Sequence, residues 1–134
     1  MSYPRLMVDG ILLLEDRLVT ILRGKPPFTG MHALPGGIVE LGETAEAAVR
    51  REFEEETGLQ VETVGIVGVY SNPGRDPRGH AVSVAFALRR VGGRLRAGTD
   101  AAAVELLNPR HLPPMAFDHA DIVRDYLAGG RRFS

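Results

Sequence analysis

Residues 44–57 contain neither glycine nor proline and are rich in alanine, glutamate and arginine. This composition favours an α-helix more strongly than that of any other segment of the chain. Thr44 is suited to the N-cap of such a helix, and Gly58 follows where a left-handed residue often ends a helix. The sequence therefore predicts an acidic helix in the middle of the chain.

The apolar residues of this helix fall on one side when successive residues are placed about 100° apart. Val49 and Phe53 lie on that side, and Glu52, Glu55 and Glu56 follow at its end. Neighbouring like charges destabilise a helix, and a bound divalent cation would reverse that effect. Three carboxylates with no histidine or cysteine nearby suit Mg²⁺ or Mn²⁺ better than Zn²⁺. The same residues also fit an ordinary acidic helix end that is solvated and paired with arginines, so the helix alone leaves both interpretations open.

The rest of the chain predicts several strands and one closing helix. Residues 6–14 and 18–22 are apolar and are separated by two acidic residues, which predicts a β-hairpin. Asp118 is expected to cap a final helix that runs to Leu127. Further strands are expected at residues 32–34, 61–71, 80–91 and 104–107. This order of elements predicts a mixed α/β sandwich and not a repeating βαβ fold.

The charge and composition of the chain exclude several classes of protein. Its 16 basic and 17 acidic residues give a net charge of −1, which argues against nucleic-acid binding by a basic face. The absence of cysteine excludes disulfides, thiolate metal sites and a cysteine nucleophile. No apolar run approaches the ~20 residues that span a bilayer, and no signal peptide is recognisable. We therefore expect one cytoplasmic domain, residues 1–134, that does not bind membranes.

Residues 37–59 combine the acidic helix with a glycine-rich turn in front of it. The fixed points are Gly37, then Glu43 after five residues, then after seven more the run Arg51-Glu52-Phe53-Glu54-Glu55-Glu56-Thr57-Gly58-Leu59. This spacing resembles the complete Nudix box, because every defined position of that motif is filled. The resemblance extends more loosely over nearly the whole chain, although His32 stands where many members carry an aromatic residue. It implies a Nudix-type α/β/α sandwich with a mixed sheet, the acidic box helix and a C-terminal helix.

The family resemblance also implies an activity and a metal site. Nudix enzymes hydrolyse a nucleoside diphosphate linked to another group, and a metal must neutralise the polyanionic pyrophosphate before water attacks phosphorus. By resemblance, Arg51 would orient a glutamate of the box, and Glu43 would brace the loop or join the metal's water shell. The implied ligands of Mg²⁺, or of Mn²⁺ in its place, are three carboxylates and a glycine carbonyl: Glu52, Glu55, Glu56, and Gly36 or Gly37.

A later loop, residues 71–80, resembles that of small bacterial and archaeal ADP-ribose pyrophosphatases of the same family. Its Arg75 and Arg78 are candidates for contact with phosphates or a ribose, and Arg23 is another candidate for a phosphate contact. The alternative is a solvated turn in which Asp76 pairs with an arginine. Both interpretations of the loop stay open at this point.

The general base is also left open by the sequence. Glu52 is the first choice, because a box glutamate can take the proton from a metal-polarised water. Many relatives use an acid on a later loop, here residues 97–105, which contains Asp100 and Glu105. Ala103 stands where ADP-ribose-cleaving relatives often carry a glutamate, so Asp100 is the favoured contribution of that loop. Two later histidines are interpreted as structural, namely His80 and His119.

These features together predict hydrolysis of ADP-ribose to AMP and ribose 5-phosphate. A second interpretation is a house-cleaning triphosphatase that removes oxidised or non-canonical nucleotides and releases pyrophosphate. A third is a nucleotide-sensing module that binds without cleaving; such regulators usually carry a DNA-binding domain, for which 134 residues leave no room. The expected partner is a small nucleotide substrate. Many relatives form homodimers, a state that charge and composition neither support nor oppose here.

Overall fold

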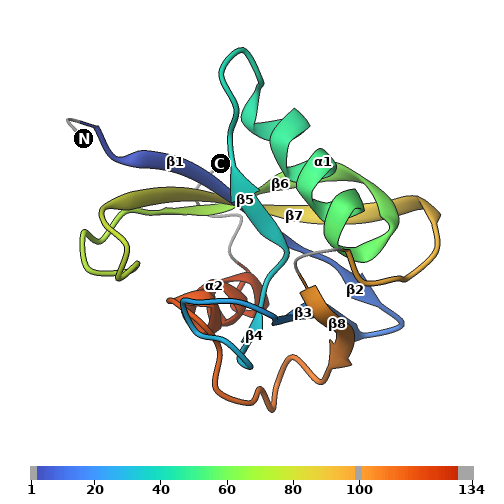
Figure 1. Ribbon diagram of the computed structural model, residues 1–134. Coiled ribbons are helices and arrows are strands. Elements are labelled where there is room, and N and C mark those ends of the chain that lie inside the picture. Colours follow the sequence, from blue (N-terminus) through green and yellow to red (C-terminus); the bar gives the residue numbers. More distant parts are fainter. Residues whose placement is uncertain (1–2, 99–100, 130–134) are drawn as a thin grey trace.

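The computed structural model describes residues 3–98 and 101–129, in which two β-sheets and two helices pack together (Figure 1). The first sheet has the strand order β5-β1-β7-β6, and β1 runs parallel to β7 while the other neighbours are antiparallel. Its strands are β1 (Arg5–Ile11), β5 (Gly36–Ile38), β6 (Leu59–Tyr70) and β7 (Ala81–Gly93). In the second sheet β3 pairs with three strands, all antiparallel. The strands of that sheet are β2 (Leu13–Leu14), β3 (Arg17–Arg23), β4 (His32–Ala33) and β8 (Ala101–Leu107).

Helix α1 (Ala45–Thr57) is the helix predicted from composition. Thr44 caps it, because its hydroxyl accepts a hydrogen bond from a backbone amide of the first turn at 3.0 Å. Gly58 ends it in the left-handed conformation, with a φ of 78°. Val49 and Phe53 are fully buried in the core that α1 shares with the first sheet. The apolar side predicted from the spacing therefore faces the protein interior.

Helix α2 (His119–Leu127) covers the opposite face of the first sheet (Figure 1). Successive side chains of β7 point to opposite faces of the sheet. Phe86 packs in the core under α1, whereas Ala85 and Ala87 pack in the core that contains Ile122 of α2. The mixed sheet thus lies between two helices, which confirms the predicted fold class. No helix in the described part of the chain is both long enough and apolar enough to cross a lipid bilayer.

The predicted hairpin between residues 6–14 and 18–22 is wrong in its first half. β1 pairs with β5 and β7 of the first sheet, and only the two residues of β2 pair with β3. The reason is burial, because residues 8–12 are buried without interruption, as in a strand covered on both faces. The turn itself is present, since Glu15 and Asp16 adopt φ values of 47° and 68° between β2 and β3.

Candidate active site

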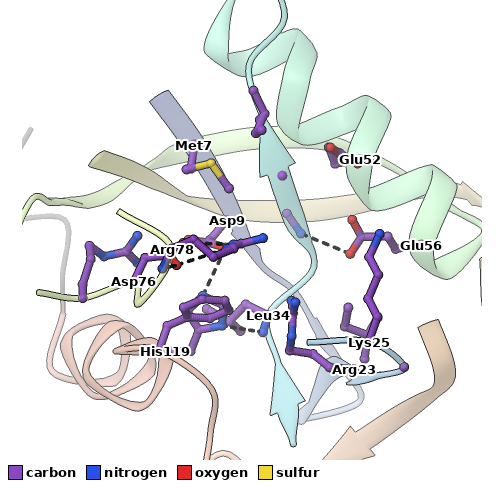
Figure 2. A pocket seen from close by; sticks show the side chains of 17 residues that line it. Met7, Asp9, Arg23, Lys25, Leu34, Glu52, Glu56, Asp76, Arg78 and His119 are labelled. Carbon is purple, nitrogen blue, oxygen red and sulfur yellow. Dashed lines mark hydrogen bonds and ion pairs between the residues drawn. The ribbon is translucent and has the colours of Figure 1, made fainter. Parts of the chain in front are cut away.

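A cavity of about 270 Å³ opens between β1, β5, α1 and the loop that precedes β7 (Figure 2). The N-terminal end of α2 and the segment after β3 also contribute to its wall. The fold thus brings residues together here that are far apart in the sequence. The ionisable side chains and the ring that line it are Asp9, Arg23, Lys25, Glu52, Glu56, Arg75, Asp76, Arg78, Phe117 and His119.

Glu52 and Glu56 form the acidic side of the cavity, about one helical turn apart on α1. Glu56 accepts a hydrogen bond from the Gly36 amide at 3.3 Å. Glu52 lies so close to Gly37 that a Cβ atom there would overlap its carboxylate. Burial, followed by the charge of Glu52, raises the pKa of Glu56 to about 9, and burial also raises the pKa of Glu52. Ionising both carboxyl groups without a cation is therefore unfavourable.

This pair of carboxyl groups fits a hard divalent cation. Glu52 and Glu56 offer carboxylate oxygens, the kind of donor that Mg²⁺ prefers, and Gly36 and Gly37 line the cavity beside them. Glu55 lies differently, because its side chain is 59% exposed and does not line the cavity. Within residues 3–98 and 101–129, no group of three or more histidine, cysteine, aspartate or glutamate side chains is arranged so that it could hold a metal ion. Two of the three predicted carboxylate ligands therefore meet at the cavity, and ligation by Glu55 stays a prediction.

Arg51 and Glu43 form a bidentate ion pair beside the acidic side of the cavity. The Arg51 guanidinium donates to both Glu43 oxygens at 2.8 and 2.9 Å, and to the Ile38 carbonyl at 3.1 Å. These hydrogen bonds from Arg51, with another from the Glu40 amide, lower the pKa of Glu43 to about 2. Arg51 also lies 3.6 Å from the Glu52 carboxylate. The pair thus ties the loop before α1 to the helix, and both predicted roles of Glu43, bracing the loop or joining the metal's water shell, stay predictions.

The basic side of the cavity is built around an aromatic ring. The guanidinium of Arg23 lies over the Phe117 ring at 5.1 Å from its centroid, and that of Arg78 lies over it at 5.7 Å. Arg23 also donates to the Pro27 carbonyl at 2.5 Å, and Arg78 donates to the Asp76 carboxylate at 2.9 and 3.1 Å. Two of the predicted phosphate-binding arginines are therefore held in place on one wall of the cavity.

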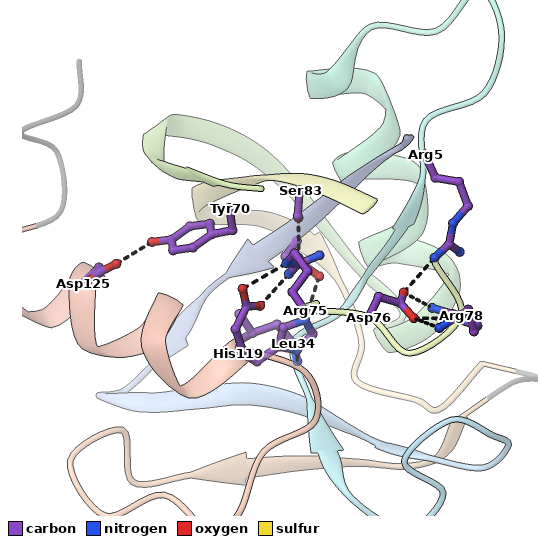
Figure 3. A network of polar contacts seen from close by, with 11 residues as sticks. Arg5, Leu34, Tyr70, Arg75, Asp76, Arg78, Ser83, His119 and Asp125 are labelled. Atoms are coloured by element: carbon purple, nitrogen blue, oxygen red, sulfur yellow. Dashed lines mark hydrogen bonds and ion pairs between the residues drawn. The ribbon is translucent and has the colours of Figure 1, made fainter. Parts of the chain in front are cut away.

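Arg75, the third predicted arginine, reaches the cavity with its guanidinium already paired (Figure 3). It donates to both Asp118 oxygens at 2.9 and 2.6 Å, and its side chain is only 4% exposed. The prediction that the Asp118 side chain caps the last helix is wrong, because that side chain makes no capping hydrogen bond. The buried guanidinium is the stronger donor and engages both carboxylate oxygens.

Asp9 and His119 are cavity residues that the sequence did not single out as functional. Asp9 is buried in β1, where a lone acid inside an apolar run was the available signal. His119 opens α2, and its Nδ1 accepts a hydrogen bond from the Leu34 amide at 2.9 Å. The structural interpretation of His119 is confirmed in that respect, although the ring also lines the cavity.

The acids of the later loop do not line the cavity in the described part of the chain. Glu105 on β8 lies 2.5 Å from the Nε2 atom of His32, and neither residue contributes to the cavity wall. Asp100 lies outside the described residues. His80, interpreted as structural, is exposed and lies 3.0 Å from the Ser71 carbonyl. Of the two candidate bases that the structure describes, Glu52 and Glu105, Glu52 is the one placed on the cavity wall.

The buried ion pairs of Asp76 are expected to make the stability of the fold depend on pH in the acidic range. The Asp76 side chain pairs with Arg5 and Arg78, as the structural alternative predicts, but it is only 2% exposed and therefore not solvated. Although burial raises the pKa of Asp76, the hydrogen bonds from Arg78 and Arg5 lower it to about 2. The resulting stabilisation is complete above the ordinary pKa of 3.8 and is lost as the pH falls through about 2.

We expect Asp76→Asn to lower the free energy of unfolding at pH 7 by about 2 kcal/mol. The difference from the unchanged chain should shrink between pH 4 and pH 2. Urea unfolding at a series of pH values measures both effects, with Asp16→Asn in the exposed β2–β3 turn as the matched control. Equal losses for the two variants, or a difference that does not change with pH, would contradict this role for Asp76.

Comparison with known proteins agrees with this geometry. The family model of the NUDIX domain matches residues 4–126. The chain is 49% identical over 125 residues to an ADP-ribose pyrophosphatase of Methanocaldococcus jannaschii, covering 93% of this chain and 74% of that protein. It is 40% identical over 103 residues to a MutT-like protein of Streptomyces ambofaciens, covering 76% of this chain and 62% of that protein. The crystal structure of a NUDIX hydrolase from Nitrosomonas europaea aligns with a TM-score of 0.84 at 25% identity, covering 96% of this chain and 72% of that one. The chain therefore belongs to the Nudix family of hydrolases.

Proposed function

We propose that this protein hydrolyses ADP-ribose to AMP and ribose 5-phosphate with the help of Mg²⁺, for which Mn²⁺ can substitute. The observation that carries the proposal is one cavity with a pair of half-buried carboxyl groups on one side and two ordered guanidinium groups on another. This charge pattern complements a metal-bound pyrophosphate. The choice of ADP-ribose is supported by the 49% identity to a relative named for that substrate. The proposed setting is the cytoplasm, and the proposed binding partner is a small-molecule nucleotide.

The metal site of the proposal consists of residues from α1 and from the turn before it. Glu52 and Glu56 would hold the cation with a carbonyl of Gly36 or Gly37, and Glu55 would complete the set. When bound, the divalent cation neutralises the pyrophosphate and activates a water molecule. Glu52 accepts the proton of the attacking water on a carboxylate oxygen.

The remaining residues of the proposal orient the reacting groups. Arg51, fixed by Glu43, lies 3.6 Å from Glu52 and keeps that carboxylate turned toward the cavity. Arg23 and Arg78 bind phosphate oxygens of the substrate, for which the planar guanidinium is well suited. Arg75 is not included among the phosphate contacts of this proposal, because its side chain is only 4% exposed and is engaged by Asp118. The Arg78 side chain also pairs with an acid, Asp76, but it is 42% exposed.

The test is a panel of nucleoside diphosphate derivatives and triphosphates, each incubated with Mg²⁺ and analysed for products. We expect AMP and ribose 5-phosphate in equal amounts from ADP-ribose, and no turnover once a chelator is added, because the pyrophosphate then keeps its charge. Release of pyrophosphate from oxidised nucleoside triphosphates, without cleavage of ADP-ribose, would replace this proposal with the house-cleaning function. Binding of ADP-ribose without any product would contradict both.

A further inference from the structure

A chain of buried hydrogen bonds runs along the cavity wall and joins three elements of the fold (Figure 3). The Ser83 hydroxyl on β7 donates to Asp9 Oδ2 on β1 at 2.5 Å. Nε2 of His119, at the start of α2, lies 3.3 Å from Asp9 Oδ1. The three side chains are at most 7% exposed. Although burial raises the pKa of Asp9, the neighbouring His119 and Ser83 lower it below its ordinary value, so Asp9 is the charged centre of this chain.

His119 connects this chain of hydrogen bonds to the turn that precedes β5. Its Nδ1 accepts a hydrogen bond from the Leu34 amide at 2.9 Å. Because Nδ1 acts as the acceptor, the ring hydrogen lies on Nε2 and points to Asp9. Asp9 therefore selects the tautomer of His119 that can hold the Leu34 amide.

The next residues of this turn are anchored one after another. The Pro35 carbonyl accepts from the Gly10 amide at 2.8 Å, and the Gly36 amide donates to Glu56 at 3.3 Å. A Cβ atom on Gly36 would overlap Asp9, so the turn lies directly against that carboxylate. The turn is thus held from Leu34 to Gly36 at the place where its backbone faces Glu56.

We propose that Asp9 and His119 are positioning residues, which hold the Leu34–Gly37 backbone in the arrangement that the reaction requires. This inference rests on the proposed function, because the same backbone carries the glycine carbonyls offered to the metal. A buried charged network is seldom the most stable way to fill such a space, since apolar side chains of similar volume often stabilise a protein more. The network's connection to the turn accounts for its presence in the cavity wall.

Two substitutions of His119 separate the two hydrogen bonds of its ring. In His119→Asn, the amide oxygen can occupy the place of Nδ1 and still accept from the Leu34 amide. In His119→Gln, the longer side chain reaches Asp9 with its amide nitrogen but leaves the Leu34 amide without its acceptor. Tyr70→Phe is the matched control, because it removes the 2.9 Å hydrogen bond from Tyr70 to Asp125 and so loosens the same helix elsewhere.

The first measurement is amide hydrogen exchange by NMR in the metal-free protein. We expect exchange at Leu34 to rise at least tenfold in His119→Gln, and to stay within about threefold of the unchanged chain in His119→Asn and Tyr70→Phe. The second is Mg²⁺ binding by calorimetry, where His119→Gln should weaken the affinity about tenfold while Tyr70→Phe does not. If His119→Gln does not fold, Ser83→Ala replaces it, with the same direction expected for both measurements.

Faster exchange at Leu34 with unchanged Mg²⁺ affinity would overturn the positioning role, and so would equal effects of His119→Gln and Tyr70→Phe. These results do not depend on the substrate. If the unchanged protein fails to cleave ADP-ribose, the proposed function fails, whereas exchange and calorimetry still decide the role of Asp9 and His119.

Discussion

Glu56→Gln is expected to slow ADP-ribose hydrolysis about a thousandfold, which corresponds to about 4 kcal/mol in the activation free energy. The metal-free variant should nevertheless be at least as stable as the unchanged chain at pH 8. The physical reason is that burial and Glu52 raise the pKa of Glu56 to about 9, so the buried group is already neutral without a cation. Glutamine has nearly the same shape as that neutral acid, and its amide oxygen can accept the hydrogen bond from the Gly36 amide. It cannot bind a cation as a carboxylate does.

The pH dependence of stability provides an independent check of Glu56. Folding raises its pKa from 4.5 to about 9, so the unfolded chain releases this proton at lower pH than the folded chain does. The metal-free protein should therefore lose stability as the pH rises from about 5 to 9, and Glu56→Gln should reduce that loss. Steady-state kinetics and thermal unfolding in chelator measure the two effects, with Glu54→Gln on the exposed side of α1 as the control. Hydrolysis within tenfold of the unchanged chain would exclude Glu56 as a metal ligand.

Arg75→Ala should be the most destabilising of the proposed substitutions, by about 3–5 kcal/mol. The guanidinium is 4% exposed and forms two hydrogen bonds to Asp118, with Asp9 3.9 Å away. Its removal leaves two acids, one of them buried, without their shared cation. A loss of this size is a large part of the 5–15 kcal/mol that stabilises a typical domain.

Arg78→Ala is the matched comparison for Arg75, since it lies in the same loop but its side chain is 42% exposed. Asp76 keeps Arg5 as a partner in that variant, so we expect a loss of about 1 kcal/mol or less. Urea unfolding at neutral pH measures the free energy of unfolding of Arg75→Ala and of Arg78→Ala. If the two variants lost similar amounts of this free energy, Arg75 would not stabilise the fold more than the exposed Arg78 does. That result would contradict the placement of Arg75 in a buried network.

The parts of the fold that depend on neighbouring residues were predictable from the sequence. Helix α1 follows from propensity and from caps at Thr44 and Gly58, which act within one turn. The placement of Glu52 and Glu56 on the buried side follows from helical periodicity alone. The orientation of Glu55 does not, because its exposed carboxylate lies 3.7 Å from Arg51 instead of in the cavity.

The parts that depend on distant partners were not predictable in the same way. β1 joins the first sheet because β7, more than 70 residues later, pairs with it in parallel, and no local pattern indicates that partner. Asp118 resembles a helix cap until Arg75 is placed beside it. Asp9 stands in an apolar strand, and its function is visible only when Ser83 and His119 are brought to it from two other elements.

The stacking of Arg23 and Arg78 on the single ring of Phe117 has a consequence for inhibitor design. Long cationic side chains usually lose rotational freedom when they capture an anion, which weakens binding. Arg23 and Arg78 have already lost this rotational freedom when the chain folds, because both are held against Phe117. A compact, rigid dianion can therefore bind to them without rearranging this wall of the cavity. Selectivity is then best sought at the opposite wall, where Glu52 and Glu56 of α1 offer carboxylate oxygens to a cation.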